Sequence, residues 1–411
     1  MTALWRVLSQ YPDFRRLFGG NSISSIGSSL TTVALPLTAV SYLGASPVEL
    51  GLLGAATFLP NLLFGIPAGL WISRLPYRRV LVIADVLRFV LLGSVPILAA
   101  FGLLAIWQLY VVIFLAGTCT LFDAVAAESF TQMLVPQSSR HSANSSMALS
   151  LSAVTTIGTA IGGALVQALT APGAIVADAI SFLLSAYWKS RIKASGHRRP
   201  SGRASESLTR QGLAGFRVIF GHPTTRPIII AAMIGALGGQ IQNVVLVLYL
   251  VRDLHLSATA VGVVLAIAGL AGVTSALAAG SIIAKLGVGP TFIIGMLLAS
   301  LAGFVLAAAT GPLPLVLIIL VAAQTLRGSG PSLYGITQQS MRQTLIPPEL
   351  LSRALATWRL LVYGVQPIGA VVGGILGELI GLRGALCVSS SFMIIGTITG
   401  FSSPLRKLKI F

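Results

Sequence analysis

The sequence predicts an all-α polytopic membrane protein whose twelve crossing helices form two parallel repeats of six. Three observations predict this class. Of the 411 residues, 55% are hydrophobic and only 9% are charged, whereas soluble domains carry about 25% charged residues. The apolar residues gather in long runs, and a helix needs about 20 of them to cross a bilayer. A constant offset of 211 positions also places landmarks of the second half on those of the first.

The apolar runs divide into two sets separated by a polar segment. The first set has approximate bounds 18–43, 50–72, 80–103, 106–127, 145–169 and 173–188. The second set has approximate bounds 228–251, 259–283, 291–310, 313–334, 355–379 and 382–401. The segment between them is rich in Arg, Ser, Gly and Pro. We therefore expect a six-helix bundle over 1–188, a cytoplasmic linker over 189–227, and a second six-helix bundle with a short basic tail over 228–411.

The charge distribution orients these runs. The net charge is +17, and the basic residues concentrate before the first run, in the linker and at the C-terminus. Cytoplasmic loops carry such an excess of Lys and Arg, and the expected external connections 45–47, 102–105 and 171–172 carry none. We therefore expect a multi-pass protein of the bacterial inner membrane with both termini in the cytoplasm. No nucleic-acid partner is expected, because aromatic residues do not alternate with the basic ones.

The residues that usually bind metals or cofactors follow no motif. Cys119 and Cys387 both fall in apolar runs, which favours neither a disulfide nor a metal site. The HExxH, P-loop and nucleophile-elbow patterns do not occur in the sequence. The sequence therefore predicts no cofactor, no metal and no enzymatic activity.

The internal repeat is parallel. Pro347 lies 211 positions after Pro136, and the same offset places Lys285 on Arg74. The best stretch matches Gln132, Leu134, Pro136 and Ala143 with Gln343, Leu345, Pro347 and Ala354. Because matching loops carry the same basic flanks, each half crosses the membrane an even number of times. Some secondary transporters are built from two such halves, which are related by an axis along the membrane normal.

The connection between the second and third runs is the most charged short stretch. Its marked positions are Gly69, Arg74, Arg78, Arg79, Asp85 and Arg88. So short a connection turns the chain back into the membrane, and its arginines favour the cytoplasmic side. Asp85 and Arg88 are three residues apart and can pair on one helix face. The simplest interpretation of the stretch is a helical hairpin with positive flanks.

The same connection carries a resemblance to a known family. Gly69…Ser73-Arg74…Arg78-Arg79 resembles the motif between helices two and three of the major facilitator superfamily. The stretches Ala84-Asp85-Val86-Leu87-Arg88, Leu121-Phe122-Asp123-Ala124 and Asp178-Ala179-Ile180-Ser181-Phe182 are similar to its twelve-helix drug–proton antiporter branch, which includes macrolide efflux proteins and the enterobactin exporter. The family usually has an acidic residue in place of Ser73. The resemblance therefore implies that the charge latch of the cytoplasmic gate is weaker, rewired or absent here.

Ionisable residues in or beside the runs are candidates for coupling, because a charge within lipid is costly. The candidates for proton carriage or charge pairing are Asp123, Glu128, Asp178, Arg327, Arg353 and Arg359. Asp123 is the first candidate for the proton. Asp123 and Glu128 can equally form ion pairs with Arg353 or Arg359. Arg327 can pair with Asp123 or attract an anionic cargo.

Polar and aromatic residues within the runs are candidates for a cargo site. They are Asn21, Gln240, Gln242, Asn243, Trp358, Tyr363 and Gln366. The alternative is that they form hydrogen bonds between helices. The resembled fold lines its cavity with helices one, four, seven and ten, which ranks Asn21, Gln240 and Asn243 first.

Two sets of glycines at small-xxx-small spacing let helix backbones approach closely. They are Gly158, Gly162, Gly163, Gly369, Gly373 and Gly374. Packing is the simplest explanation, and we also consider that these fifth and eleventh helices slide during transport.

These features predict a monomeric secondary transporter that exports amphipathic small molecules by alternating access, with protons as the coupling ion and the lipid bilayer as its solvent. Few charges and apolar walls favour drug-like cargo over sugars or ions. Alternatives are a dedicated exporter of one endogenous metabolite, such as a siderophore or an antibiotic, and a transport-inactive membrane scaffold, an idea prompted by Ser73. Lipid translocation also remains open.

Overall fold

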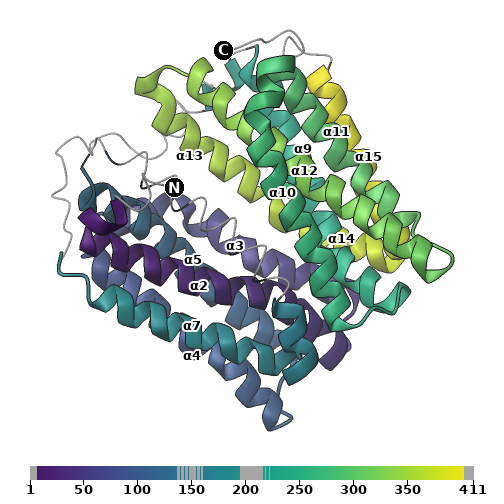
Figure 1. Cartoon of the computed structure of the whole chain (residues 1–411), viewed down its shortest axis with the longest axis horizontal. Coiled ribbons are helices and arrows are strands. Elements are labelled where there is room, and N and C mark those ends of the chain that lie inside the picture. Colours follow the sequence, from purple (N-terminus) through teal and green to yellow (C-terminus); the bar gives the residue numbers. More distant parts are fainter. Residues whose placement is uncertain are drawn as a thin grey trace. The chain divides into compact units, whose positions relative to one another are not determined.

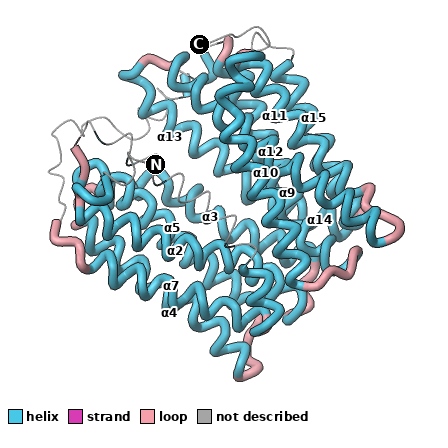
Figure 2. The backbone as a smooth tube through the Cα atoms, viewed as in Figure 1, coloured by secondary structure: helices cyan, strands magenta, loops and turns pink. Residues whose placement is uncertain are grey.

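The part of the chain that the structure describes consists of helices joined by short loops (Figures 1 and 2). A computed structural model describes residues 7–136, 161–194 and 223–401, with positions 139, 143, 147, 154, 158, 216, 217 and 219–221 between them. Eleven helices in these ranges are long and apolar enough to cross a membrane. Most of the predicted fifth crossing, over 145–169, falls outside them. The structure is therefore that of a multi-pass membrane protein.

The first part of the chain supplies one set of helices. They are α2 (Pro12–Leu37), the π-helical turn η1 (Thr38–Tyr42), α3 (Pro47–Ile72), α4 (Tyr77–Ala100), α5 (Ile106–Leu134) and α7 (Ala171–Ser190). The second part supplies α9 (Thr225–Leu248), the π-helical turn η3 (Tyr249–Asp253), α10 (Ala258–Leu286), α11 (Val288–Ala307), α12 (Leu313–Leu345), α13 (Pro348–Gly364), α14 (Gln366–Leu379) and α15 (Gly381–Phe401). The two π-helical turns are not visible in the hydropathy pattern.

The helices gather into two compact units. Unit 1 contains Met1–Ala45, Leu59–Ala204 and Ser257–Val263, and unit 2 contains Ser46–Phe58, Ser205–Leu256 and Val264–Phe411. The first turns of α3 thus belong to unit 2, and the first turns of α10 belong to unit 1. The chain passes from α3 to α4 between Ile72 and Tyr77, where the sequence predicts the arginine-rich turn.

Two helices are longer than the apolar runs that predict them. We expected the fourth and tenth crossings to end near residues 127 and 334, whereas α5 continues to Leu134 and α12 to Leu345. The added turns are polar and contain Glu128, Gln132 and Gln338. Hydropathy detects the apolar length of a helix that lies in lipid, and it does not detect polar turns that extend the helix beyond that length.

The 211-residue repeat is reproduced in the helix contacts. A Cβ added to Gly158 would lie 3.1 Å from the carbonyl oxygen of Ile26, and one added to Gly369 would lie 2.7 Å from that of Leu237. Gly369 lies 211 positions after Gly158, and Leu237 lies 211 positions after Ile26. In the equivalent pairs, a Cβ added to Gly162 would lie 3.1 Å from the Cα of Leu30, and one added to Gly373 would lie 2.9 Å from the Cα of Ile241.

The same correspondence holds for the closest glycine contacts. A Cβ on Gly163 would lie 2.7 Å from the Cα of Gly262 in unit 1, and one on Gly374 would lie 3.1 Å from the Cα of Gly51 in unit 2. Gly262 lies 211 positions after Gly51, as Gly374 does after Gly163. The six predicted packing glycines therefore all lie where backbones meet. Whether these helices also slide stays a prediction.

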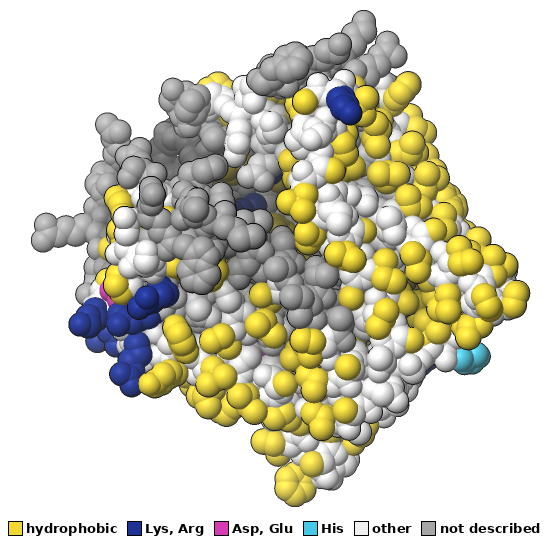
Figure 3. Space-filling view, viewed as in Figure 1, with side chains coloured by type: hydrophobic (Ala, Val, Ile, Leu, Met, Phe, Trp, Pro, Cys, Tyr) yellow, Lys and Arg dark blue, Asp and Glu magenta, His cyan; other side chains and the backbone are white. Residues whose placement is uncertain are grey.

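Large apolar side chains cover the outer faces of the helices. Leu277 is 76% exposed, Leu379 75% and Ile318 66%, and Figure 3 shows hydrophobic side chains spread over the visible surface with Lys and Arg gathered in few places. Such a surface would be a liability in water and suits contact with lipid. Polar groups of the spanning segments must therefore find partners inside each unit.

Candidate functional site

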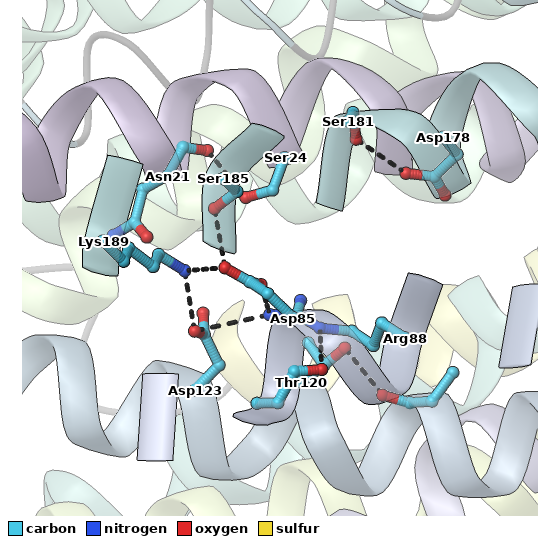
Figure 4. Close-up of polar contacts among 12 residues, drawn as sticks. Asn21, Ser24, Asp85, Arg88, Thr120, Asp123, Asp178, Ser181, Ser185 and Lys189 are labelled. Atoms are coloured by element: carbon cyan, nitrogen blue, oxygen red, sulfur yellow. Dashed lines mark hydrogen bonds and ion pairs between the residues drawn. The ribbon is translucent and has the colours of Figure 1, made fainter. Parts of the chain in front are cut away.

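Four charged side chains of unit 1 form a closed ring inside the bundle (Figure 4). Lys189 Nζ of α7 lies 2.9 Å from Asp85 Oδ2 of α4 and 2.8 Å from Asp123 Oδ1 of α5. Arg88 Nη2 of α4 pairs with Asp85 Oδ1 and lies 3.3 Å from Asp123 Oδ1. Each acid thus contacts both bases. We call Asp85, Arg88, Asp123 and Lys189 the charge ring.

The helical spacing explains how the ring assembles. Asp85 and Arg88 are three residues apart on α4, which places them on one face, as the sequence predicts. On α7, Ser185 lies one turn before Lys189, and its hydroxyl donates a hydrogen bond of 2.7 Å to Asp85 Oδ2. The guanidinium of Arg88 also lies 4.3 Å from the centre of the Phe182 ring. Three helices are therefore joined by charge-assisted contacts.

The ring is buried and electrically balanced. The exposed fractions of the side chains are 0% for Asp85 and Lys189, 5% for Arg88 and 13% for Asp123. Two carboxylates face two cations, so the ring carries no net charge. Removing one partner of a buried ion pair leaves an uncompensated charge, which costs about 3–5 kcal/mol. The ring thus holds α4, α5 and α7 in one relative arrangement.

The ring lies inside the apolar length of unit 1, toward the arginine-rich turn. Asp85 follows the first residue of α4, Tyr77, by eight residues, or about 12 Å. Of the other positions in the motif, Gly69, Arg74 and Arg79 are exposed and Arg78 is half-buried. Only Asp85 and Arg88 of this motif therefore reach the interior. The changed latch expected at Ser73 stays a prediction.

The sequence reasoning did not identify the partners that the structure gives to Asp123, which are Arg88 and Lys189. Neither Arg327 nor Arg359 is paired with Asp123 among the ion pairs of the described side chains, and pairing with Arg353 stays a prediction. Composition placed Lys189 in the basic linker, whereas it is a fully buried residue in the last turn of α7. A signal was available, because Ser185 and Lys189 continue the face of α7 that begins at Asp178.

The remaining charged candidates lie elsewhere. Glu128 on α5 and Arg359 on α13 are exposed. The side chain of Arg353 lies outside the described part of the chain. Trp358 is buried, and the guanidinium of Arg342 lies 4.5 Å from the centre of its indole ring.

Asp178 is a second buried acid of unit 1, and its surroundings differ from those of the ring. Its exposed fraction is 1%, and its Oδ1 accepts a hydrogen bond of 3.2 Å from the Ser181 hydroxyl (Figure 4). A Cβ added to Gly27 of α2 would lie 2.4 Å from the same oxygen, so glycine leaves the room that Asp178 occupies. Among the described side chains, no Lys or Arg lies within ion-pair distance of Asp178.

Unit 2 contains a half-open cavity of about 500 Å³. Small residues of α9 line one wall: Ala232, Gly235, Ala236 and Gly239. A Cβ added to Gly239 would meet no atom within 4 Å, because the wall faces open space there. The side chains of this wall are too short to fill the space, and we call the resulting hollow the unit 2 cavity.

A stripe of α12 forms the facing wall. Its cavity-lining residues are Arg327, Gly328, Pro331, Tyr334 and Gln338. Apart from Gly328, they follow one another at intervals of four, three and four residues. This spacing keeps them on one helical face. Pro331 has no N–H to donate to the carbonyl of Arg327, so one backbone acceptor of α12 loses its usual partner at this wall.

Polar groups converge on the cavity. Arg327 Nη2 donates a hydrogen bond to Asn243 Oδ1, and Asn243 Nδ2 donates one of 3.2 Å to Gln240 Oε1. Gln338 is 8% exposed, and its Nε2 has no hydrogen-bond partner in the described structure. The acids whose side chains are described all lie outside the cavity lining.

Most of the predicted cargo residues line this cavity. They are Gln240, Gln242, Asn243, Tyr363 and Gln366. Trp358 is not among the lining residues, because it packs in the apolar core of unit 2. Asn21 belongs to α2 in unit 1, where its buried Oδ1 has no described partner. Sequence reasoning missed Gln338, because it ended the tenth helix at residue 334.

Comparison with known proteins places this chain among membrane transporters. The profile of a family described as "transmembrane secretion effector" matches residues 4–410. The multidrug efflux pump Tap of Mycolicibacterium fortuitum is 25% identical over 393 residues, which cover 93% of this chain and 94% of that protein. Macrolide efflux protein A of Streptococcus pyogenes is 27% identical over 125 residues, or 30% of each chain.

The solved structures show the fold. A crystal structure of a mutant of the nucleoside transporter NupG superposes with a TM-score of 0.79 at 12% identity, covering 95% of this chain and 99% of that one. At so low an identity the likeness bears on architecture alone. It confirms the predicted fold class.

Proposed function

The chain belongs to the transmembrane secretion effector family of the major facilitator superfamily, and from this premise we propose that it exports amphipathic small molecules by proton antiport. The unit 2 cavity is the observation that carries the proposal. Its volume of about 500 Å³ lies within the range of about 300–1,000 Å³ typical of sites for drug-sized ligands.

The lining of the cavity suits a cargo with an apolar body and a few polar groups. Alanine and glycine residues of α9 supply a neutral wall, and the amides of Gln240, Asn243 and Gln366 supply hydrogen-bond donors and acceptors. The names of the two relatives, a multidrug efflux pump and a macrolide efflux protein, support export of drug-like compounds.

We assign the coupling proton to Asp178. A carboxyl group without a cation partner can gain or lose a proton without breaking an ion pair. Asp123, the first candidate from the sequence, would lose contacts with both Arg88 and Lys189. Asp178 has a hydroxyl partner and lies buried inside unit 1. Intramembrane acids of this kind commonly serve as proton carriers in transporters.

The duplicated architecture supports alternating access. Parallel repeats related by an axis along the membrane normal move against one another around a site near mid-membrane. The basic loops support a topology in which both termini lie in the cytoplasm. We propose that the membrane is the bacterial inner membrane. We propose that a single chain performs the transport cycle.

Everted membrane vesicles test this proposal. Wild-type vesicles loaded with a proton gradient should accumulate members of a compound panel that includes a macrolide, and a proton uncoupler should abolish the accumulation. Asp178→Asn should abolish gradient-driven accumulation and leave exchange of labelled for unlabelled compound intact. Glu378→Gln, at an exposed acid of α14, is the matched control and should transport normally.

Two results would contradict the proposal. Accumulation of the panel that is equal with and without the chain would remove export. Gradient-driven accumulation that survives Asp178→Asn would remove Asp178 from coupling.

A further inference from the structure

The buried cations of unit 1 and the half-buried Arg327 of unit 2 have different partners. In unit 1, Arg88 and Lys189 are matched by two carboxylates. In unit 2, the guanidinium of Arg327 contacts the neutral amide of Asn243. The ion pairs found among the described residues do not include Arg327. Within the described part of unit 2, no carboxylate therefore compensates its charge at the cavity wall.

The position of Arg327 makes this unusual. It follows the first residue of α12 by fourteen residues, or about 21 Å along the helix. A cation at this depth is costly unless an anion or a polar cavity accompanies it. Helices α9, α10, α11, α12 and α15 contain no Asp or Glu at all. The helices of unit 2 thus place few acids where one could approach Arg327.

The side-chain amide of Gln338 is a second polar group at the cavity whose donor has no described hydrogen-bond partner. The Gln338 amide is more than nine-tenths buried, lines the cavity and has an Nε2 without a hydrogen-bond partner in the described structure. An amide nitrogen donates hydrogen bonds and does not accept them. The stripe of α12 that carries Arg327 and Gln338 therefore presents a hydrogen-bond donor to the cavity at each of these two positions.

We propose that the unit 2 cavity selects cargo bearing one negatively charged group, a carboxylate, phosphate or sulfonate, which binds to the guanidinium of Arg327. A guanidinium matches the geometry of such oxyanions. The apolar body of the cargo lies against the small residues of α9. This inference rests on the proposed export function and narrows its cargo to amphipathic anions. An anionic lipid headgroup offers the same chemistry as a soluble amphiphile.

A matched pair of probes tests the charge preference. Dansylglycine carries a carboxylate, and dansylglycinamide has the same fluorescent body without the charge. Binding to the purified full chain in phosphatidylcholine nanodiscs is measured by dansyl fluorescence. Wild-type protein should bind dansylglycine about tenfold to a hundredfold more tightly than dansylglycinamide.

Variants at the cavity wall make the test specific. Arg327→Gln should bring the two affinities to within about twofold of one another, whereas Arg327→Lys should retain part of the preference. Asn243→Asp leaves Arg327 in place and supplies it with a carboxylate, so it should also abolish the preference. Arg342→Gln removes a cation of the same helix that stacks on Trp358 outside the cavity, and it should keep the wild-type ratio.

The outcomes separate this inference from the export proposal. Equal wild-type affinities, or a preference that survives both Arg327→Gln and Asn243→Asp, would overturn the anion site and leave export untouched. A preference that depends on Arg327, in a protein that moves no dansylglycine in vesicles, would support the site and contradict export. Adding phosphatidylglycerol to the nanodiscs distinguishes the sources, because a headgroup in the site would displace dansylglycine from wild-type protein.

Discussion

The charge ring of unit 1 and the cavity of unit 2 overlap in the repeat at two of the four ring positions. The offset of 211 places Asp85, Arg88, Asp123 and Lys189 on Met296, Ala299, Tyr334 and Gly400. Their packing corresponds as well. The Ser185 hydroxyl contacts Asp85, and a Cβ on its counterpart Gly396 would lie 3.2 Å from Met296 Cε.

This comparison explains why unit 2 is hollow. Ala299 and Tyr334 line the cavity, and at their counterparts in unit 1 stand Arg88 and Asp123, which fill the interior with ion pairs. Met393, another lining residue, corresponds to Phe182, on which Arg88 lies. One helical framework thus supports either a filled, cross-linked interior or a space for a ligand, depending on a few side chains.

The largest effect is expected from unbalancing the charge ring. Lys189→Met leaves two buried carboxylates facing one cation, and should lower the free energy of unfolding by about 3–5 kcal/mol. Thermal unfolding in detergent, followed by the fraction of monodisperse protein, measures the loss. Replacing the whole ring with its unit 2 counterparts (Asp85→Met, Arg88→Ala, Asp123→Tyr, Lys189→Gly) removes every charge and should recover much of it. An unchanged melting temperature for Lys189→Met would show that the ring is not stabilising.

Next come the paired glycines, which test whether the two repeats respond alike. Gly162→Leu and Gly373→Leu each push a side chain against a backbone Cα that lies 3.1 Å or 2.9 Å from a Cβ. Each should cost about 1–3 kcal/mol by overpacking and abolish transport in protein that still reaches the membrane. Vesicle transport normalised to the amount of inserted protein is the measurement. Full activity of either variant would exclude a role in helix movement.

A smaller effect is expected at Ser185. Ser185→Ala removes the hydrogen bond to Asp85 but keeps both of its cation contacts, so the expected loss is about 1 kcal/mol. The counterpart of Ser185 in unit 2 is Gly396. The change in stability of Gly396→Ala is therefore measured for comparison with that of Ser185→Ala. A loss for Ser185→Ala as large as that for Lys189→Met would mean that the hydroxyl, and not charge balance, holds the ring.

The smallest effect on stability is expected inside the cavity. Gly239→Leu adds a side chain where no atom lies within 4 Å of the Cβ position, so stability should change by less than about 0.5 kcal/mol. The added volume should raise the KM for large cargo and spare small cargo. Transport assays with compounds of graded size measure this. A large loss of stability would show that the space is not open.

The sequence carries much of the fold and little of the site. Apolar runs predict the crossings, and the Asp85–Arg88 spacing predicts their pair. The partners of Asp123 depend on which faces of α4, α5 and α7 meet, and no pattern within one helix contains that information. Lys189 was missed because it ends an apolar run, where composition cannot distinguish a loop from the last buried turn.

The sequence predicted some of the polar residues that line the cavity, but it did not predict the cavity itself. Single polar residues such as Gln240 and Asn243 stand out in an apolar run, and both line it. The hollow itself arises from what is missing at Ala299 and Gly239, and small residues in a membrane helix are equally common at tight contacts. Only the packed structure separates a glycine that touches a backbone, such as Gly373, from one that faces open space.

The balanced ring has an electrical consequence. Its four charges sum to zero, so the membrane voltage does no net work on the ring whatever depth it reaches. A lone cation such as Arg327 would instead feel about 2.3 kcal/mol for each 100 mV it traverses. An anion bound beside Arg327 would cancel this electrical work. The loaded carrier could then change between its two orientations with no free-energy cost from the membrane potential.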